Sequence, residues 1–463
     1  MKQYPYVYFL GIGGIGMSAL ARWFNQQGAQ VFGYDRAATA LTDQLTLEGI
    51  TIHFEDAVEA IPHKILHHKP QSLVVYTSAI SKHQPILAYL QANNYTVCKR
   101  AEVLGLITQQ HFTLAIAGTH GKTTTTSLAA HVLHQAGRNL TAFLGGVAKN
   151  YGSNLVINGE GNKGTMVVIE ADEFDRFFLH LHPDIAIVTT VDPDHLDTYQ
   201  DSQAFEQSFC DFIHKVPQQG QAIVHQEVAK NLLARGCKPE LVQYALLEAP
   251  IRAENVYISH GCFVFDYISE SVTIKDIHLA APGYHNVENA LAVITACLSI
   301  GLEPAVIRQG VNTFQGVKRR FDYIIQREDL VFLDDYGHHP VEIAALLRTI
   351  RQVYPGKKVT VVFRPNLYTR TRDFADGFAQ ALSLADQVFL LDIYPDREEP
   401  IEGVSSALIF DQMELEQKYL CTKEDLIDRL AAHGKPEVIV NLGSGGTSQF
   451  ILPIKEFLLH HWG

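Results

Sequence analysis

Residues 116–124 carry the most specific chemical signal in this sequence, reading Ile-Ala-Gly-Thr-His-Gly-Lys-Thr-Thr. They follow an apolar run typical of a strand and precede a helical pattern, which is the setting of a phosphate-binding loop. The two glycines let backbone N–H groups turn toward phosphate oxygens, and the start of the helix adds positive potential. We therefore expect Lys122 to reach the terminal phosphates of a nucleotide and the Thr123 hydroxyl to bind Mg²⁺.

This loop departs from the strict phosphate-loop pattern, which has glycine where this chain has Ile116. Gly118 and Gly121 define a shorter variant, Gly-Thr-His-Gly-Lys-Thr. The structural alternative is a Ser/Thr-rich helix start that contains Gly-Lys by chance. The position between a strand and a helix favours the phosphate loop.

Two polar turns follow later strands of the same expected sheet. The strand expected at 166–169 ends in the acidic segment 170–173, and the strand expected at 185–191 runs into the Asp/His-rich segment 192–197. Ligands of open α/β sheets bind at the carboxyl ends of the strands, and Mg²⁺ prefers oxygen ligands. Either turn alone is more typical of a solvated loop, but two of them after a phosphate loop indicate a nucleotide–metal site.

A second glycine-rich turn lies near the start of the chain, where 11–16 read Gly-Ile-Gly-Gly-Ile-Gly after an apolar run. With Asp35 at the end of the next expected strand, the pattern alone indicates a nicotinamide-dependent dehydrogenase. The same turn at a helix N-terminus accepts any pyrophosphate, so a UDP-sugar fits equally, with Asp35 free to bind ribose or uracil. Tight strand–helix packing is the alternative that needs no ligand. The dehydrogenase interpretation leaves Lys122 and the two polar turns without a role.

These motifs are set in a repeated alternation of short apolar strands, such as those expected at 7–10, 30–34 and 72–76, and helical patterns. The length of 463 residues suggests about three domains, and we place them at 1–107, 108–316 and 317–463. Strands separated by helix-length segments predict parallel sheets, so the expected fold class is α/β throughout. Residues 220–280 break the alternation and predict a small antiparallel excursion in the second domain, with short strands at 264–267 and 272–274.

The composition excludes several classes of protein. Apolar residues make up 47% and charged residues 19%, enough for several cores, and the net charge of −13 gives no electrostatic footprint for nucleic acid. No apolar run reaches the ~18 residues that span a bilayer, and no secretory leader is recognisable. The six cysteines show no short pair spacing, which argues against a disulfide framework and a zinc site. We therefore expect a reduced, soluble, cytoplasmic protein.

Segments in all three expected domains resemble the Mur ligases of bacterial cell-wall synthesis. The matching segments follow the family order and cover nearly the whole chain: 118–124, 170–175, 192–199, 283–286, 314–322, 334–342 and 368–373. Three segments are similar to the branch of the family that adds L-alanine: 11–17, 170–175 and 335–342. The resemblance implies an N-terminal Rossmann-like domain for a UDP-sugar, a central P-loop ATPase-type α/β domain and a C-terminal Rossmann-like domain for the amino acid.

The activity implied by the resemblance is ATP- and Mg²⁺-dependent ligation of L-alanine to the carboxylate of UDP-N-acetylmuramate through an acyl phosphate. This reaction belongs to peptidoglycan precursor synthesis and involves neither nucleic acid nor membrane insertion. A related branch of the family joins a whole tripeptide to the same UDP-sugar, but it lacks the Tyr-Thr-Arg-Thr-Arg run found here at 368–372. A P-loop switch that hydrolyses ATP for a partner is a further alternative.

The resemblance also assigns residues to the substrates. ATP is expected to contact Gly118, Thr119, His120, Gly121, Lys122, Thr123, Thr124, His285, Asn286, Asn289, Arg320, Asp335 and Tyr336. The UDP-sugar is expected to contact Gly11, Gly13, Gly14, Gly16, Asp35, Ser78 and Arg100. Mg²⁺ is expected beside Thr123, Glu170 and His195, and the catalytic residues are expected to be Lys122, His338 and Arg370.

Two departures from the family pattern limit this assignment. The alanine-adding branch has Pro-His-Arg-Tyr where this chain has Pro365-Asn366-Leu367-Tyr368, so no role is carried over to the two central positions. Several relatives have a carbamoylated lysine about fifteen residues after the histidine that corresponds to His195, where this chain has Cys210. We therefore expect no carbamate at a second metal.

Overall fold

The structure is a computed structural model of the chain, and it divides into two compact units, each of which is described by itself. The first unit consists of Met1–Val256, Phe265–His278 and His285–Gln315, and the second of Tyr257–Val264, Leu279–Tyr284 and Gly316–Gly463. The residues described are 4–81, 83–159, 164–192, 199, 201–237, 240–395, 398–444 and 446–463.

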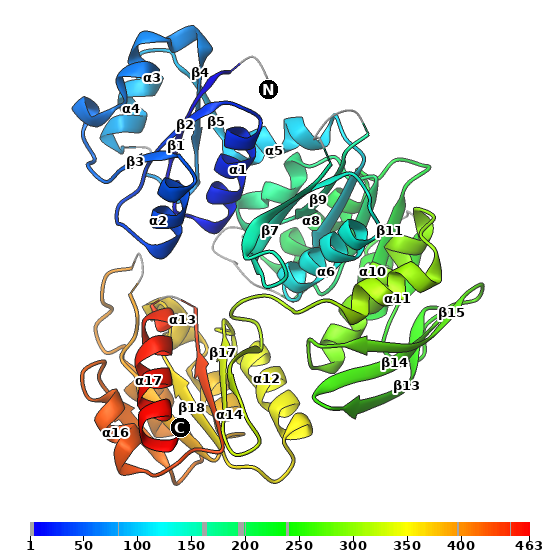
Figure 1. Ribbon diagram of the computed structural model, residues 1–463, viewed down its shortest axis with the longest axis vertical. Coiled ribbons are helices and arrows are strands. Elements are labelled where there is room, and N and C mark those ends of the chain that lie inside the picture. Colours follow the sequence, from blue (N-terminus) through cyan, green and yellow to red (C-terminus); the bar gives the residue numbers. More distant parts are fainter. Residues whose placement is uncertain are drawn as a thin grey trace. The chain divides into compact units, whose positions relative to one another are not determined.

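The first sheet of the first unit is parallel, five-stranded and ordered β3-β2-β1-β4-β5 (Figure 1). Its strands are β1 (Tyr6–Leu10), β2 (Gln30–Tyr34), β3 (Thr51–His53), β4 (Ser72–Tyr76) and β5 (Thr96–Lys99). The helices between and after them are α1 (Ile15–Gln26), α2 (Ala40–Leu47), α3 (His63–His67), α4 (Pro85–Ala92) and α5 (Arg100–Thr108). The strand order reverses between β1 and β4, and ligands of such sheets bind at that point, outside the carboxyl ends of the strands.

The second sheet of this unit has seven strands in the order β12-β11-β10-β6-β9-β7-β8, with only the β7–β8 pair antiparallel. Its strands are β6 (Thr113–Ala117), β7 (Leu140–Ala148), β8 (Ser153–Asn158), β9 (Met166–Glu170), β10 (Ile185–Val188), β11 (Gln221–His225) and β12 (Leu241–Tyr244). The accompanying helices are α6 (Lys122–Gln135), α8 (Ser202–Ile213), α9 (Gln226–Ala234), α10 (Tyr284–Ser299) and α11 (Pro304–Asn312).

The two sheets of the first unit share one apolar core. Side chains of α1, α5 and α8, including Phe24, Ile107 and Phe209, pack with alternate residues of both sheets. A buried hydrogen bond joins the same parts, because the Arg22 guanidinium donates to Asn154 on β8. The same guanidinium is held in place by the Glu48 carboxylate at the end of α2, at 2.7 and 2.9 Å. The first sheet is therefore anchored to the second by apolar packing and by the hydrogen bond from Arg22 to Asn154.

A separate three-stranded sheet follows, with β13 (Arg252–Ser259), β14 (Cys262–Ile268) and β15 (Thr273–Leu279) in that order. Its neighbouring strands are joined by the short segments 260–261 and 269–272, which only antiparallel pairing allows, as the break in the pattern at 220–280 predicts. Their boundaries run further than the expected strands at 264–267 and 272–274.

The second unit contains a six-stranded sheet ordered β16-β17-β21-β18-β19-β20, in which only β16 is antiparallel to its neighbour. Its strands are β16 (Asp322–Gln326), β17 (Val331–Asp335), β18 (Val359–Phe363), β19 (Gln387–Leu391), β20 (Lys418–Cys421) and β21 (Val438–Leu442). The helices are α12 (Pro340–Val353), α13 (Tyr368–Asp373), α14 (Ala375–Leu382), α15 (Ala407–Gln412), α16 (Leu426–Ala432) and α17 (Ile451–Trp462).

Helices cover both faces of this sheet (Figure 1). Val361 packs in a core with α12, α14 and α15, whereas the next residue, Val362, packs in a core with α16 and α17. Successive side chains of a strand point to opposite faces, so β18 is buried on both sides, as in other doubly wound sheets. The expected α/β fold class is confirmed.

Two expectations from the sequence are wrong. The strand expected at 185–191 ends at Val188, because the following residues bind the phosphate loop instead of a neighbouring strand. The cysteine spacing argued against a disulfide, yet Cys210 and Cys237 are joined by one. The two cysteines are 27 residues apart in the sequence, so their spacing does not indicate a contact. They come together because Cys210 lies on α8 and Cys237 follows α9.

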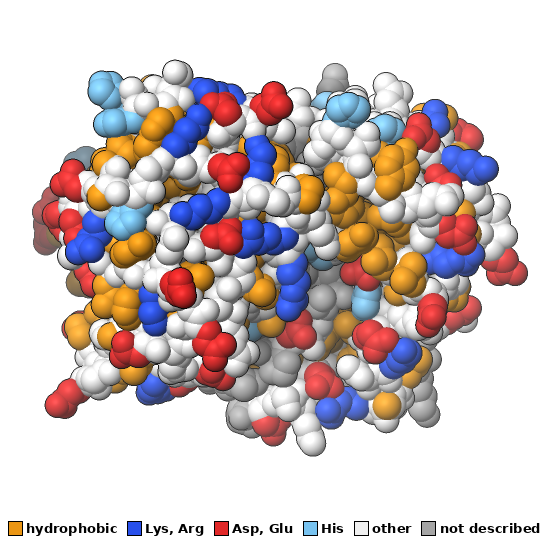
Figure 2. Space-filling model, turned by 90° about the horizontal axis from the view of Figure 1, so that it is seen from below, with side chains coloured by type: hydrophobic (Ala, Val, Ile, Leu, Met, Phe, Trp, Pro, Cys, Tyr) orange, Lys and Arg blue, Asp and Glu red, His pale blue; other side chains and the backbone are white. Residues whose placement is uncertain are grey.

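The surface carries charges of both signs, as the composition indicates. Acidic and basic side chains are interspersed on the face shown in Figure 2. Among the residues that the structure describes, no helix combines the length and the apolar character that crossing a membrane requires.

Candidate nucleotide and substrate sites

The expected phosphate loop lies between β6 and α6, as predicted, and it needs both of its glycines. Gly118 has φ +134° and Gly121, the residue before α6, has φ +83°, a region that side chains disfavour. A Cβ at position 118 would also lie 2.0 Å from the Thr189 hydroxyl. The loop therefore passes too close to its support for any larger residue at 118.

The segment after β10 holds this loop in place. Thr190 accepts two bonds, from Thr119 N to its carbonyl and from His120 N to its hydroxyl, both at 2.9 Å. The Thr189 hydroxyl donates to the carbonyl of His120 at 2.5 Å. The sequence gives no sign of the role of the two threonines, because adjacent β-branched residues after an apolar run are typical of a continuing strand.

Lys122 is folded back against its own loop. Its ammonium donates to the carbonyls of Gly118 at 2.6 Å and Thr119 at 3.2 Å, and it forms an ion pair with Glu173 in which the two N–O distances are 2.9 and 2.8 Å. Burial alone would lower the pKa of Lys122, but the carboxylates of Glu173, Asp172 and Glu170 outweigh it, so the net pKa is raised and the lysine is charged. Burial raises the pKa of Glu173, with Lys122 acting against it.

Glu170 lies at the carboxyl end of β9, next to the strand that enters the loop. It is in register with Ile116, and the following residue, Ala171, donates to the Ile116 carbonyl at 2.8 Å. A Cβ at Gly145 would lie 2.1 Å from the Glu170 carboxylate, whose Oε2 accepts from Gly145 N at 3.1 Å. The absence of a side chain at 145 thus leaves space for this carboxylate at the sheet edge.

The oxygen donors near this edge fit Mg²⁺. Thr123 lies in the first turn of α6 and is 8% exposed, and Glu170 supplies a carboxylate at the end of β9, the strand beside β6. Hydroxyl and carboxylate oxygens are the hard ligands that Mg²⁺ prefers. The third expected ligand, His195, lies outside the described residues.

Helix α10 brings two of its predicted residues to the phosphate loop. A Cβ at Gly121 would lie 2.8 Å from Asn289 Oδ1, so the Asn289 amide packs directly against the loop. Asn289 donates to Asn286 Oδ1 at 3.2 Å, and both amides are nearly buried. His285 precedes them in the first turn of α10. A pair of amides at this position can recognise polar edges of a nucleotide.

The glycine-rich turn at 11–16 joins β1 to α1, as expected, and Asp35 closes it. Asp35 Oδ2 accepts from Gly13 N and Oδ1 accepts from Arg36 N, both at 2.7 Å. A Cβ at position 13 would lie 2.9 Å from Asp35 Oδ2. The carboxylate that we expected to be free for a ribose or uracil therefore also orders the turn. Ser78 is exposed just after β4, the strand next to β1.

Arg100 lies beside the same turn. A Cβ at Gly16 would lie only 2.1 Å from Arg100 Nη1, and the guanidinium stacks over the Phe177 ring with its carbon 4.6 Å from the ring centre. Burial lowers the pKa of Arg100, while Asp172 and Glu170 act in the opposite direction. This cation thus lies near both the glycine-rich turn and the acidic turn after β9. Gly14 immediately precedes α1 in an extended conformation.

The remaining predicted residues lie in the second unit. The Tyr336 ring is covered by two guanidinium groups, those of Arg319 and Arg320, each 5.1 Å from the ring centre. Arg319 was not among the residues expected from the sequence. Its guanidinium pairs with Asp334 at 3.1 Å and donates to the carbonyl of Gly443 at 2.7 Å. Arg320 is therefore the member of the pair with a looser contact, 3.9 Å from Glu342.

Asp335 organises the backbone of this cluster. Its Oδ2 accepts from Phe321 N at 2.7 Å and its Oδ1 accepts from Gly337 N at 2.8 Å. Burial raises the pKa of Asp335 to about 6, with Arg320 acting against it. Both oxygens thus fix the two turns that carry Arg320 and Tyr336.

His338 is held in one orientation. Its Nδ1 lies 3.1 Å from the Tyr336 carbonyl, and because a carbonyl only accepts, Nδ1 carries the proton and Nε2 is the acceptor. Burial lowers the pKa of His338 to about 4; Glu342 opposes this shift, and Arg370 adds to it. His338 is therefore neutral at pH 7, and Arg370 lies close enough to influence it. Glu342, which accepts from His338 N at 3.0 Å, also caps α12.

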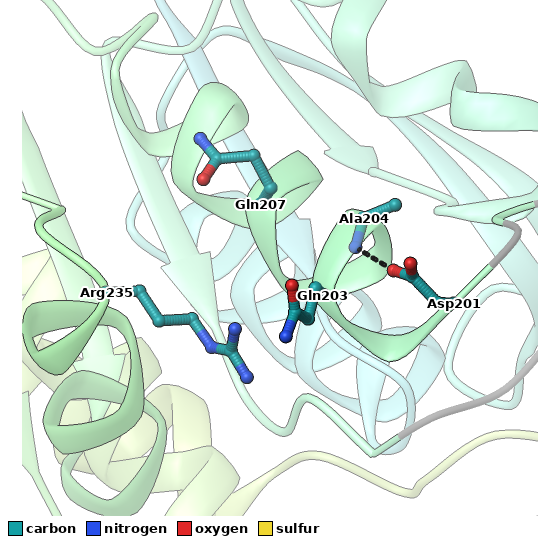
Figure 3. Close-up of a pocket in the computed structure, with 5 residues that line it drawn as sticks. All are labelled: Asp201, Gln203, Ala204, Gln207 and Arg235. Atoms are coloured by element: carbon teal, nitrogen blue, oxygen red, sulfur yellow. Dashed lines mark hydrogen bonds between the residues drawn. The ribbon is translucent and has the colours of Figure 1, made fainter.

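A separate open pocket lies along α8, lined by Asp201, Gln203, Ala204, Gln207 and Arg235 (Figure 3). Its charged groups have partners. Asp201 accepts from Ala204 N at 2.8 Å as the helix cap, and Arg235 forms an ion pair with Glu206. Since these groups are already paired, the pocket adds no catalytic group to the sites above.

The chain matches three family models in succession. They are described as Mur ligase family, catalytic domain (residues 6–112), Mur ligase middle domain (116–297) and Mur ligase, glutamate ligase domain (319–445). A UDP-N-acetylmuramate–L-alanine ligase of Flavobacterium johnsoniae is 45% identical over 459 residues, which is 99% of both chains.

Solved structures resemble the whole fold. A UDP-N-acetylmuramate–alanine ligase of Thermotoga maritima has a TM-score of 0.81 and 26% identity, over 98% of this chain and 99% of that one. A murein peptide ligase of Psychrobacter arcticus has a TM-score of 0.69 and 24% identity, over 97% and 98% of the two chains.

Proposed function

The chain belongs to the Mur ligase family, and we propose that it joins L-alanine to the carboxylate of UDP-N-acetylmuramate using ATP. The observation that carries this proposal is the phosphate loop 118–124, whose lysine lies beside the acidic turn after β9. The full-length likeness to an alanine-adding ligase, at 45% identity, supports the choice of substrates.

In the first step, an oxygen of the UDP-N-acetylmuramate carboxylate attacks the γ-phosphorus of ATP. The bond from phosphorus to the β,γ-bridging oxygen breaks, which releases ADP and leaves an acyl phosphate. Lys122 and the loop N–H groups stabilise charge on the phosphate oxygens, and such fixed donors act mainly by position and charge. We assign Asn286 and Asn289 to the nucleoside end of ATP, with His285 beside them.

Mg²⁺ would be held by Thr123 and Glu170, together with His195. When bound, it would draw negative charge from the phosphate oxygens. The residues of the loop position the nucleotide for attack in line with the leaving oxygen.

In the second step, the amine of L-alanine attacks the carbonyl carbon of the acyl phosphate. The bond from carbon to the phosphate oxygen breaks, phosphate leaves, and the amine loses a proton as the amide forms. Neutral His338 presents Nε2 as an acceptor, which suits it to orient the amine N–H. Arg370 and Arg320 supply positive charge for phosphate oxygens, and Asp335 and Tyr336 keep Arg320 in place.

We assign the UDP-sugar to the glycine-rich turn of the first sheet. Backbone N–H groups at 11–16 and the start of α1 suit a pyrophosphate, and Arg100 adds a partly buried cation. Asp35 and Ser78 border the same edge of the sheet. We further propose that the three functional domains follow the divisions 1–107, 108–316 and 317–463.

The test is phosphate release with ATP, Mg²⁺ and UDP-N-acetylmuramate against L-alanine, L-serine, glycine and the tripeptide. Release that depends on both the UDP-sugar and L-alanine supports the proposal. Release with the tripeptide alone assigns the chain to the recycling branch, and release without any amine contradicts a ligase.

A further inference from the structure

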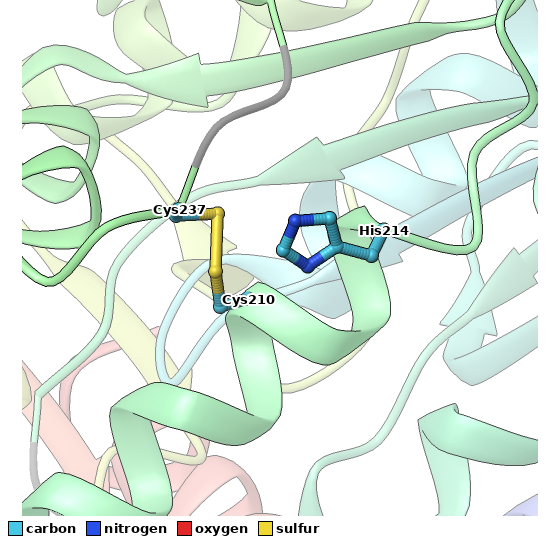
Figure 4. Close-up of side chains that lie close together, drawn as sticks. All are labelled: Cys210, His214 and Cys237. Carbon is cyan, nitrogen blue, oxygen red and sulfur yellow. A yellow bond between two sulfur atoms is a disulfide. The ribbon is translucent and has the colours of Figure 1, made fainter.

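Two cysteines and a histidine come together at one end of α8, away from the residues assigned above (Figure 4). Cys210 lies in the last turn of α8, and His214 follows directly after that helix. Cys237 comes from the segment after α9. Both cysteines are buried, at 5% and 2% exposure, whereas His214 is exposed. Solvent therefore reaches the imidazole side of the site, whereas the sulfur side is buried.

The helix sets the geometry of this cluster. His214 N donates to the Cys210 carbonyl at 2.9 Å, so the helical turn continues and the side chains at 210 and 214 lie on one face. In Figure 4 the His214 ring extends toward the two sulfur atoms. No described side chain forms a hydrogen bond with this ring in the structure, which leaves its nitrogens available.

The ligand atoms of the three residues all lie within 4.8 Å of one another. Two thiolates at ~2.3 Å from one tetrahedral Zn²⁺ are about 3.8 Å apart. The two sulfur atoms are bonded to each other in the structure, so they must move apart after reduction to hold the ion. The two Cα atoms are 5.8 Å apart, a separation that permits a disulfide as well. The backbone therefore supports either state of the sulfur pair.

We propose that the reduced pair Cys210–Cys237, together with His214, binds a thiophilic divalent cation of the Zn²⁺ class, and that metal binding and disulfide formation exclude one another. Thiolate and imidazole are the soft and borderline ligands that select such an ion over Mg²⁺. A water molecule on the open side completes a tetrahedral set. The inference rests on this ligand set alone and is independent of the proposed ligase activity.

The chemistry of the two states balances. On metal binding, each thiol releases one proton and each sulfur donates an electron pair to the cation. On oxidation, the two thiols lose two protons and two electrons to a low-molecular-weight disulfide, which is reduced to two thiols by exchange. The two sulfur atoms are then bonded to each other and are no longer thiolates that donate to the metal, so the cation leaves.

The disulfide and the metal-bound thiolate pair join the same two segments, α8 and the segment after α9. The ion pair between Glu206 and Arg235 already connects α8 to the segment after α9, four residues before Cys210 and two residues before Cys237. This contact holds the segments together when the disulfide is reduced. The ligands therefore stay close enough to capture a metal ion.

The experiment uses the full chain, reduced and freed of metal, and then titrated with Co²⁺ as a spectroscopic probe for Zn²⁺. The proposal predicts a thiolate-to-cobalt charge-transfer band that saturates at a single equivalent and disappears when Zn²⁺ is added. Oxidised wild-type protein, with its disulfide closed, must give no such band. That comparison needs no substitution and so does not depend on whether a variant folds.

Two variants locate the site. Cys210→Ser should abolish the band, and His214→Ala should weaken binding by ~100-fold or more, because losing a ligand exceeds the ~10–100-fold cost of losing a residue that only orients one. Cys262→Ser, which alters a free cysteine on β14, is the matched control and should leave the titration unchanged. A band that survives in Cys210→Ser or in oxidised protein, or no band in reduced wild type, would overturn the proposal.

Discussion

The ammonium of Lys122 lies 2.9 Å from one oxygen of Glu173 and 2.8 Å from the other, in a pair that protein almost encloses. The same ammonium donates to two carbonyls of its own loop. A nucleotide phosphate must therefore compete with Glu173 for this cation, and the loop is held in shape before any ligand arrives.

Replacing Lys122 with Ala should lower kcat by roughly 100- to 1,000-fold, the usual effect of losing one charged or hydrogen-bonding donor to the transition state. The fold should persist, because burial raises the pKa of Glu173 to about 7 and this carboxyl can take up a proton when its partner is gone. Lys230→Ala on α9, which removes an exposed lysine, is the control and should retain full activity. Circular dichroism checks the fold, and phosphate release measures the rate.

Glu173→Gln should destabilise the protein without nucleotide by about 3 kcal/mol, since it leaves a buried ammonium without its counter-charge. A bound phosphate can replace that charge, so the rise in Tm on adding an ATP analogue should be larger in the variant than in wild type. Glu227→Gln, at an exposed ion pair with Lys230, should change neither value. Equal nucleotide-induced shifts in wild type and Glu173→Gln would show that phosphate and Glu173 do not share the lysine.

Gly16→Ala should weaken UDP-sugar binding selectively. The added Cβ would lie 2.1 Å from Arg100 Nη1, and the guanidinium is packed on Phe177, so it must shift out of place. We expect KM for UDP-N-acetylmuramate to rise by ~10-fold, or about 1.4 kcal/mol, with a much smaller change for ATP. Initial rates with each substrate varied in turn measure the two KM values. An equal rise in both would refute a role confined to the UDP-sugar.

His338→Ala should separate the two steps of the reaction. If His338 orients the amine, acyl phosphate should still form and be trapped by hydroxylamine, while amide formation falls by ~100- to 10,000-fold. His278→Gln on β15 provides a control at an exposed histidine. Loss of acyl phosphate to the same extent as loss of amide would argue against the assignment.

Acid should destabilise the fold through His131. Burial lowers its pKa to about 4, with His134 acting in the same direction, and its ring binds Tyr151 and Thr313 at 2.9 and 3.0 Å. The unfolded chain, with a histidine pKa near 6.5, binds the proton first, so stability is full above about pH 6.5 and is lost toward pH 4, by at most about 1.4 kcal/mol per pH unit.

The measurement is the fall in Tm as the pH is lowered from about 7.5 to about 5. In this range the unfolded chain binds a proton on His131 more readily than the folded chain does. It should be smaller in His131→Gln than in wild type, although the variant starts from a lower Tm because it loses buried hydrogen bonds. The exposed variant His278→Gln should follow wild type. A fall of equal size in His131→Gln would place the acid sensitivity elsewhere.

Local patterns predicted much of the fold. The bounds of β2 and β4 agree with the expected strands at 30–34 and 72–76, since each begins at a polar residue and is followed by one, Asp35 or Thr77. The strand expected to reach 191 stops at Val188, because Thr189 and Thr190 use their hydrogen-bonding groups on the phosphate loop. Strand propensity alone carries no information about such a partner.

In the candidate site too, local features were predicted from the sequence and contacts between distant segments were not. The glycines of both turns were found from their spacing, because the backbone itself demands them. The partnership of Lys122 with Glu173 and the covering of Tyr336 by Arg319 were not found, since they depend on contacts between distant segments. The approach of Cys210 to Cys237 was missed for that reason too.

The central claim is that residues 118–124 hold the terminal phosphates of ATP next to Glu170. A crystal structure with a non-hydrolysable ATP analogue and Mg²⁺ tests it most directly. The account predicts phosphate density within the loop, with the Lys122 ammonium turned toward it. A nucleotide bound only at the glycine-rich turn 11–16, with the 118–124 loop empty, would contradict the account.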